Sequence, residues 1–483
     1  MFMQLKRALL ERSVFSRGSI PPWSACGRAV FCRFLWRVLM FLTVLFVALQ
    51  LLSAFHQFWN NKQTSSFLTS DRNATCQPKN HVFFLKTHKT ASSTILNILY
   101  RYGDTHNLTF ALPENIYQFS YPHFFMSHFV KGMKSRRVTE FHIMCNHMRF
   151  QGPEVRKVMP LDTFYFSILR NLVSMMESLL TYYKSISAFR NFKTVEDFLL
   201  DEGRSYSDTM PGNNYARNNL TFDFGFNNSA PSGEAELDER AEALISAVES
   251  EFHLILILEY FDESMVLLRH ALCWTLDDVV SFRLNSRSEK TRKSLSVEMT
   301  EQVKKWSSLD WRLYQHFNAS FWRRIDTSLG RTKLQEEVEL LRARRAVLEK
   351  TCLSEGGAVH PAHVLDSSLK PFQYGQAVIQ GYNIRPGLDN DTHRFCHRLI
   401  MPELQYTRAL YVKQFPDIAA KKDEGKKHPT PGKHIINAKR NSTSAPVTEN
   451  RNSTVQANMP ILAKDNMDVK DNANSAEAKQ HKT

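Results

Sequence analysis

The sequence predicts an α/β domain built on a mostly parallel sheet. Three short apolar runs, at 81–85, 164–169 and 254–258, have the length and composition of buried strands. Each run leads through a polar loop into a stretch with helical periodicity. The third run is apolar at every position, which is typical of a strand buried on both faces. Strands that alternate with helices in this way favour a parallel sheet, whose ligands bind where the strands end.

The size and charge of the chain limit the classes of protein to which it can belong. With 483 residues, 43% of them hydrophobic, it can bury a large core. The formal net charge of +14 suggests a nucleic-acid partner at first sight. However, residues 1–37 carry a net +6 and residues 421–483 a net +5, so the region between them is nearly neutral. We therefore expect no nucleic-acid partner.

A membrane anchor is predicted near the N-terminus. Residues 38–55 form an apolar run of eighteen residues, just long enough to span a bilayer. Three arginines precede the run, so the positive-inside rule predicts a cytoplasmic tail at 1–37 and a luminal body. The alternative, a cleaved signal peptide, fits less well with so long a preceding segment. We expect a single-pass type II protein with a short polar stem at 56–79.

Sequons and cysteines agree with a luminal body. Eight N-x-Ser/Thr sequons follow the apolar run and none precedes it. Glycosylation is predicted at six of them, Asn73, Asn107, Asn219, Asn227, Asn318 and Asn390, and two more sequons lie at Asn441 and Asn452. Five cysteines also follow the run, so at least one is free or pairs between chains. Cys352 and Cys396 are a plausible pair, although their spacing does not prove it.

Histidines are frequent between residues 104 and 160, and they include His123, His128, His142 and His147. They lie scattered, without paired ligand spacing, so we interpret them as hydrogen-bonding or substrate-facing side chains. Neither CxxC nor HExxH occurs in the chain, and the sequence therefore supports no metal site.

The remaining segments are read from composition and periodicity. Residues 191–250 look polar and variable, with an insertion-like part at 227–237. A heptad-spaced apolar stripe predicts a helix over 332–350, packed on the core rather than in a coiled coil. Residues 421–483 contain no Phe, Tyr or Trp, and a disordered polar tail is expected there.

The loop after the first apolar run carries the most specific chemistry. It reads Lys86-Thr87-His88-Lys89-Thr90-Ala91-Ser92-Ser93 and leads into a helix-like run. It lacks the glycines of a Walker A loop. Two lysines, and small hydroxyl residues that open a helix, nevertheless suit a phosphate-like anion. The sequence offers no convincing acidic site for the magnesium that a nucleotide kinase needs.

A second anion site is predicted at the end of the second run. Arg170 ends that run, and Ser178 lies about two turns into the following helix, close enough to share one phosphate with it. Two anion sites at neighbouring strand ends suit a nucleotide with two separate phosphate groups, which points to 3′-phosphoadenosine-5′-phosphosulfate. An ordinary salt bridge at Arg170 is the alternative, and the basic loop disfavours it.

The chain resembles the Golgi galactose 3-O-sulfotransferases. Residues 84–94 are similar to their 5′-phosphosulfate loop, and the similarity continues in the segments 145–150, 164–171, 259–264, 282–287 and 401–406. The resemblance covers about 76–417 and implies a P-loop-like sulfotransferase fold for a luminal domain at 80–420. It also implies a Golgi membrane protein that uses this donor to sulfate the 3-hydroxyl of β-linked galactose. One departure is Leu172, where the family usually has proline.

Roles follow for individual residues. We expect the donor to bind at Lys86, Thr87, Lys89, Thr90, Ala91, Ser92, Ser93, Arg170 and Ser178, with Arg287 either at the 3′-phosphate or on the surface. His88 is the predicted general base, because an imidazole of ordinary pKa suits proton abstraction from a sugar hydroxyl. The alternative is that His88 only hydrogen-bonds the donor. Lys86 and Lys89 would stabilise the leaving phosphate. Acceptor contacts are assigned to His147, Arg149, Tyr215, Asn219 and Asp223.

Three functions remain open at this point. The favoured one is a sulfotransferase for glycoprotein β-galactosides of type 1 or type 2 chains, which needs no metal. A glycolipid enzyme acting on galactosylceramide is the second. A non-catalytic glycan-binding membrane glycoprotein is the third, and the joint presence of the predicted donor residues argues against it. Assembly into a homodimer is left open.

Overall fold

The computed structural model describes residues 36–43, 45–46, 49–50, 76–114, 117–134, 138–201, 203–288, 295–354 and 357–417. The chain divides into two units, 1–75 and 76–483, and the folded elements below belong to the second. No helix among the described residues is long and apolar enough to cross a bilayer. Much of the predicted anchor, most of the stem and the predicted tail lie outside the described residues.

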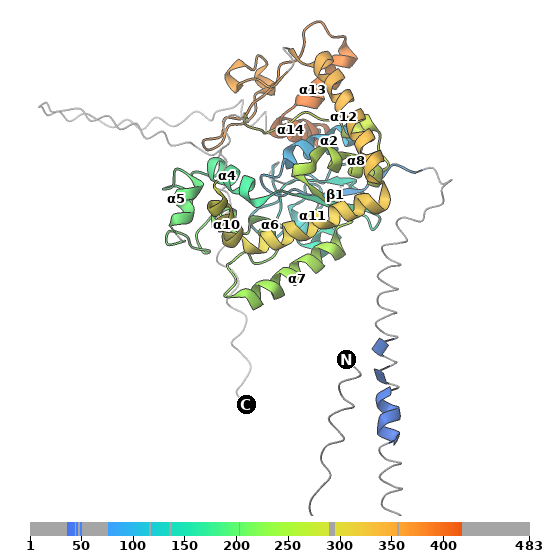
Figure 1. Ribbon diagram of the computed structural model, residues 1–483. Coiled ribbons are helices and arrows are strands. Elements are labelled where there is room, and N and C mark those ends of the chain that lie inside the picture. Colours follow the sequence, from blue (N-terminus) through green and yellow to red (C-terminus); the bar gives the residue numbers. More distant parts are fainter. Residues whose placement is uncertain are drawn as a thin grey trace, which may run out of the picture. The chain divides into compact units, whose positions relative to one another are not determined.

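Four parallel strands form the sheet in the described part of the chain. They are β1 (Val82–Leu85), β2 (Ile143–Met144), β3 (Phe164–Leu169) and β4 (Leu254–Ile257), in the order β2-β1-β3-β4 (Figure 1). Every residue of these strands is buried. The α/β class, the parallel sheet and the three predicted strands are confirmed. Strand β2 was not predicted, because a run of two residues carries no periodicity.

Each of the three predicted strands is followed by a helix, as expected. These helices are α2 (Ser92–Thr105), α4 (Leu172–Tyr182) and α8 (Phe261–Leu272), the last after a short 3₁₀ turn at Leu258–Tyr260. Asn171 begins α4 by accepting a hydrogen bond from the Val173 amide at 3.0 Å. Parallel strands place their carboxyl ends at one edge of the sheet, so the loops after β1 and β3 meet there.

The C-terminal part is helical. It contains α10 (Val297–Trp306), α11 (Ser308–Ser328), α12 (Arg331–Cys352), α13 (Asn390–Ile400) and α14 (Glu403–Gln414). Helix α12 confirms the predicted one and packs on α8 through its buried leucine stripe. Figure 1 shows α2 and α8 on one side of the sheet and α7 and α11 on the other. The sheet is thus covered on both faces.

Helix α7 (Glu234–Glu251) corrects the prediction of a polar, insertion-like segment. Its buried residues are Leu237, Ala241, Leu244 and Val248, and it packs against α11. Only this narrow apolar stripe distinguishes the helix from a solvated acidic segment, so composition alone was misleading. Shorter helices in the described residues include α3 (Gly152–Val155), α5 (Val195–Leu200), α6 (Asn219–Asp223) and α9 (Leu276–Val279).

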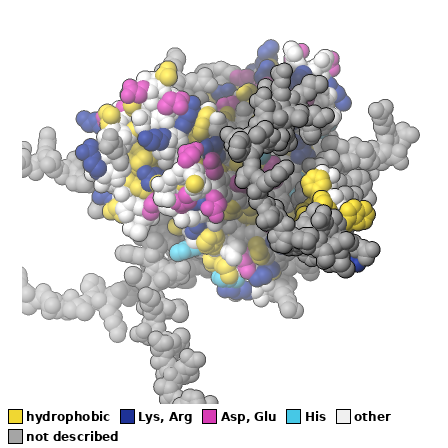
Figure 2. Space-filling view, turned by 60° about the horizontal axis from the view of Figure 1, so that its bottom comes forward, with side chains coloured by type: hydrophobic (Ala, Val, Ile, Leu, Met, Phe, Trp, Pro, Cys, Tyr) yellow, Lys and Arg dark blue, Asp and Glu magenta, His cyan; other side chains and the backbone are white. Residues whose placement is uncertain are grey.

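Two disulfides tie distant segments together. Cys352 at the end of α12 bonds to Cys396 in α13, which confirms the plausible pair. Cys76 bonds to Cys273, directly after α8, and Cys145 is free and buried. On the face drawn in Figure 2, the coloured Lys, Arg, Asp and Glu side chains are interspersed rather than gathered by sign.

Candidate functional site

The loop between β1 and α2 is held in place by its own hydroxyl groups. The Thr87 hydroxyl donates to the Ile168 carbonyl of β3 at 2.7 Å, and the Ser92 hydroxyl donates to the Thr87 carbonyl at 2.7 Å. Lys89 and Ala91 adopt the left-handed backbone conformation, with φ of 60° and 59°. Such a conformation costs roughly 1–2 kcal/mol for a residue other than glycine. The loop therefore makes a tight turn into the start of α2 without using glycine.

His88 is oriented by Asp223, the last residue of α6. The buried carboxylate accepts the His88 backbone N–H at 2.9 Å and lies 2.9 and 3.0 Å from His88 Nδ1. It also accepts the Tyr121 hydroxyl at 2.9 Å. Because an ionised carboxylate only accepts hydrogen bonds, Nδ1 is a donor, so the neutral tautomer of His88 has its proton on Nδ1. Nε2 then presents a lone pair, which is the form that a general base requires.

His147 connects His88 to Lys86. The two imidazoles stack nearly parallel, with centroids 4.0 Å apart. His147 Nδ1 lies 2.8 Å from the Lys86 carbonyl, so it donates, and Nε2 accepts from Lys86 Nζ at 2.7 Å. Burial first, then repulsion from His88 whenever that ring is protonated, and then the charge of Lys86, hold the pKa of His147 well below its usual range. A neutral His147 therefore positions the Lys86 ammonium, a role that differs from the predicted acceptor contact.

Glu403, the first residue of α14, completes the loop from the far end of the chain. Its Oε2 lies 3.3 Å from Lys86 Nζ and accepts the Ser93 hydroxyl at 2.6 Å. Asn285 Nδ2 donates to the same hydroxyl at 3.2 Å. The resemblance in 401–406 marked this segment, but nothing in the sequence showed that its carboxylate reaches a loop more than 300 residues earlier.

Four cations gather at the carboxyl ends of β1 and β3. Burial is the main reason that the pKa of Lys89 falls to about 7, and Arg170, Arg287 and Lys86 lower it further, while Glu177 opposes them. Lys89 Nζ lies 3.7 Å over the Tyr182 ring. A half-buried lysine repelled by three cations is stabilised by an anion, so this arrangement fits an anionic ligand.

Arg170 and Arg287 both lie against α4. Arg170 donates through Nη1 to the Lys89 carbonyl at 2.8 Å and through Nε to the Ser174 hydroxyl at 2.9 Å. Ser174 is one helical turn before the predicted partner, Ser178, which is buried in α4. Arg287 forms an ion pair with Glu177 of α4. Arg287 is therefore part of the cationic cluster rather than an isolated surface charge.

Aromatic rings surround the imidazole of His88. Tyr121, Tyr215 and Tyr183 lie 4.7, 5.1 and 6.2 Å from it between ring centroids, and Tyr183 and Tyr215 stack on each other at 4.0 Å. A sugar ring packs its apolar face on such surfaces. Of the predicted acceptor residues, Tyr215 thus belongs to the wall beside His88.

The other predicted acceptor residues are placed differently. Arg149 lies between the rings of Phe124 and Phe222, at 3.8 and 4.0 Å, and donates to the Phe226 carbonyl. Asn219 begins α6 and is buried. Asp223 supports His88 from the interior, as described above. The acceptor contact predicted for Asp223 stays a prediction beside its contact with His88.

The predicted glycosylation sites divide by exposure. Asn107, Asn227 and Asn390 are exposed, Asn318 is half-buried, and Asn73 lies outside the described residues. Asn219 is only 1% exposed, and the hydroxyl of its sequon partner Thr221 donates to buried Asp310 at 2.7 Å. Asn219 is therefore the least accessible of the predicted positions that the structure describes, and its glycosylation stays a prediction.

Comparisons with known proteins show which family the chain resembles. The sequence model described as galactose-3-O-sulfotransferase matches residues 28–414. The chain is 51% identical over 344 residues to galactose-3-O-sulfotransferase 2 of Sus scrofa, covering 70% of this chain and 85% of the relative. It is 38% identical to galactose-3-O-sulfotransferase 4 of Bos taurus, covering 74% and 87%.

A third relative bears a different name. The chain is 39% identical over 336 residues to the galactosylceramide sulfotransferase of Homo sapiens, covering 68% of this chain and 78% of the relative. The family match spans most of the chain, including both β1 and Glu403. The protein therefore belongs to the galactose-3-O-sulfotransferase family.

Proposed function

We propose that the protein transfers a sulfuryl group from 3′-phosphoadenosine-5′-phosphosulfate to the 3-hydroxyl of β-linked galactose on glycoprotein glycans. The observation that carries the proposal is His88, held by Asp223 and placed between two lysines at the carboxyl end of β1. The similarity to galactose-3-O-sulfotransferase 2 supports galactose as the acceptor sugar, and within that class we propose type 1 and type 2 chains. The similarity to a galactosylceramide sulfotransferase keeps a glycolipid acceptor as the alternative.

The side chains of the site fit this donor. When bound, the donor supplies an activated sulfuryl group. Lys86, Lys89 and the N-terminus of α2 would hold its phosphosulfate, because amides at a helix start and buried cations both favour anions. Arg170 and Arg287, gathered against α4, would hold the 3′-phosphate.

Different residues of the site perform different parts of the proposed transfer. His88 Nε2 accepts the proton of the galactose hydroxyl, and Asp223 stabilises the imidazolium that forms. Lys86, held by His147 and Glu403, and Lys89 stabilise negative charge on the departing phosphate. Positioning and electrostatics suffice for a direct transfer, without a covalent intermediate on the protein.

The cellular arrangement forms part of the proposal. We infer a Golgi type II membrane protein with its cytoplasmic tail at 1–37, its anchor at 38–55, its stem at 56–79 and a luminal domain of P-loop-like sulfotransferase fold at 80–420. Two disulfides support a luminal domain, since such bonds persist in oxidising compartments.

Sulfate transfer to a panel of acceptors tests the function. Radiolabelled donor is offered with type 1, type 2, core 1 and galactosylceramide acceptors, and kcat/KM is measured for each. We expect type 1 or type 2 chains to exceed galactosylceramide by about tenfold or more, a difference of roughly 1.4 kcal/mol in transition-state binding. A matched acceptor with 3-deoxygalactose should receive no sulfate. Preference for galactosylceramide would favour the glycolipid alternative, and no transfer at all would favour a glycan-binding protein.

The low pKa of Lys89 predicts a pH-dependent affinity for the donor product, adenosine 3′,5′-bisphosphate. A bound anion raises the pKa of Lys89 above its value of about 7 in the free protein. Binding above pH 7 therefore takes up a proton, and the affinity falls by up to about tenfold per pH unit.

Calorimetric titrations from pH 7 to pH 9 measure this slope, in a range where the phosphates, with second pKa values of about 6, stay fully ionised. Lys89→Arg keeps its charge throughout and should flatten the slope. An equal slope in this variant would show that another group takes up the proton.

A further inference from the structure

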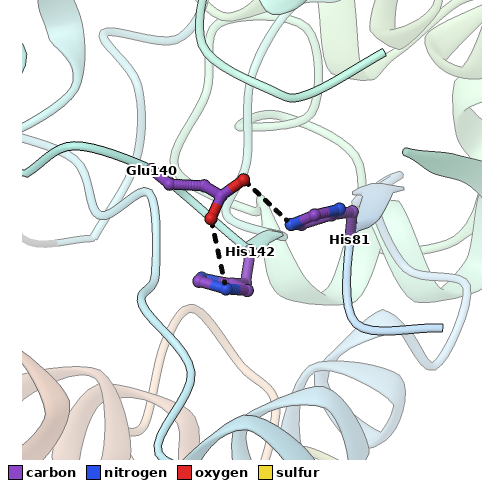
Figure 3. A group of neighbouring side chains, drawn as sticks. All are labelled: His81, Glu140 and His142. Carbon is purple, nitrogen blue, oxygen red and sulfur yellow. Dashed lines mark ion pairs between the residues drawn. The ribbon is translucent and has the colours of Figure 1, made fainter. Parts of the chain in front are cut away.

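A second cluster of titratable side chains lies at the opposite edge of the sheet. His81 directly precedes β1 and His142 directly precedes β2, and these two strands pair in parallel. Their amino-terminal ends therefore lie side by side, with the length of β1 between them and the loop that carries His88. Glu140, two residues before His142, reaches the same place (Figure 3).

The three side chains converge on one point. Glu140 Oε1 lies 3.4 Å from His81 Nε2, and Glu140 Oε2 lies 3.8 Å from His142 Nε2. One ligand atom from each residue lies within 4.8 Å of the others. Zinc–ligand distances of about 2.0–2.2 Å place the ligands of a tetrahedral site roughly 3.3–3.6 Å apart. The two glutamate–histidine distances of 3.4 and 3.8 Å are close to this range, so a small inward movement of the three side chains completes the tetrahedral geometry.

The hydrogen bond on the far side of His81 prepares it as a ligand. Its Nδ1 lies 2.8 and 2.9 Å from the two carboxylate oxygens of Asp162. A carboxylate only accepts hydrogen bonds, so Nδ1 carries the proton and Nε2 offers its lone pair toward Glu140. A carboxylate behind a histidine is the arrangement that orients metal ligands in many zinc sites.

His142 presents its ring to the same carboxylate. The Thr109 backbone N–H donates to His142 Nδ1 over 3.4 Å, which is a long and weak hydrogen bond. Metal binding at Nε2 requires the proton on Nδ1 and so gives up this hydrogen bond, but the loss is small because the bond is weak. The side chains of His81 and His142 are 19% and 24% exposed, and that of Glu140 is 51% exposed. The imidazoles are thus held by packing while an ion can enter from solvent.

We propose that His81, Glu140 and His142 bind one Zn²⁺ ion, with water as the fourth ligand. Two imidazoles and one carboxylate are a ligand set that zinc accepts. The ion would fasten the two-residue edge strand β2 to β1, next to the pair Val82 and Ile143. Its role is structural, because the site lies away from the residues that perform the proposed transfer.

Zinc titration of the purified full chain, first stripped with a chelator, tests the site. Calorimetry should show that the chain binds one more equivalent of Zn²⁺ than the double variant His81→Ala/His142→Ala. A hundredfold excess of Zn²⁺ over its Kd should raise the unfolding midpoint of the wild-type chain by about 2–5 °C. Glu140→Gln, at an exposed position, should weaken binding while the fold stays intact.

His316→Ala is the matched control. His316 pairs with Glu249 at 2.6 Å and is similarly exposed, but it lies outside the cluster. This variant should keep the full zinc stoichiometry and the thermal shift. Co²⁺ in place of Zn²⁺ should give the absorption of a tetrahedral site in the wild-type chain and lose it in Glu140→Gln.

Equal stoichiometry in the wild-type chain and the double variant would overturn the proposal, and the cluster would then be a pair of ordinary histidine–glutamate ion pairs. A thermal shift that also disappears in His316→Ala would overturn it as well. These readouts do not depend on sulfate transfer, so they stand apart from the proposed function.

Discussion

His88→Ala is expected to lower kcat for sulfate transfer by about 10²–10⁴-fold. The substitution removes the Nε2 lone pair that takes the proton of the sugar hydroxyl. It leaves the His88 backbone N–H, which donates to Asp223 at 2.9 Å, and so preserves the loop. The affinity for adenosine 3′,5′-bisphosphate should therefore stay within about threefold of wild type, because the cations of the site remain in place. Steady-state kinetics and calorimetry on the same preparation measure both quantities.

His128→Ala serves as the control, since His128 is exposed on a short 3₁₀ turn at Ser127–Phe129. It should transfer sulfate at the wild-type rate. Added imidazole should restore part of the activity of His88→Ala and leave His128→Ala unchanged. If His88→Ala loses nucleotide binding together with transfer, His88 holds the donor or the loop and another group is the base.

Asp223→Asn should lower kcat by about 10²–10⁴-fold with little change in KM for the galactoside. The amide can donate to His88 Nδ1, whereas the carboxylate can only accept from it. The ring then carries its proton on Nε2 and cannot take one from the acceptor. Nitrogen chemical shifts of the imidazole report this change of tautomer, and a purely structural role of Asp223 would not produce it.

Tyr121→Phe is the companion variant. It removes the hydrogen bond from the Tyr121 hydroxyl to Asp223 at 2.9 Å but keeps the aromatic ring beside His88. We expect a loss of less than about tenfold in kcat, because the carboxylate keeps its contacts with His88. If Tyr121→Phe were as damaging as Asp223→Asn, the hydroxyl itself would take part in the reaction.

The parts of the site that are contiguous along the chain could be predicted from the sequence. The strands before Lys86 and Arg170 are short, mostly apolar runs, and each is followed by its basic residue and a helix, so local patterns were enough. Asp223 and Glu403 reach the loop from 135 and 310 residues away, as their contacts with His88 and Ser93 show. No periodicity connects such positions, and only the folded chain brings them together.

Two other features of the structure could not be read from the sequence. Ser178 was predicted to share a phosphate with Arg170, and this stays a prediction; the guanidinium itself reaches Ser174 of α4, one helical turn before Ser178. The cluster at His81, Glu140 and His142 escaped notice because two separate strands deliver it. Motif searches for metal sites look for ligands a few residues apart, and 61 residues separate the two histidines.

The contact between Glu403 and Lys86 has a consequence for biosynthesis. The loop between β1 and α2 leaves the ribosome about 300 residues before the carboxylate that balances its buried Lys86. At ordinary translation speeds this delay is roughly 15–60 s. Until α14 docks, the Lys86 ammonium lacks this counter-charge and is better solvated by water than by protein. The contact between Glu403 and Lys86 therefore forms at a late stage of folding, when the C-terminal helices pack against a sheet whose strands were synthesised earlier.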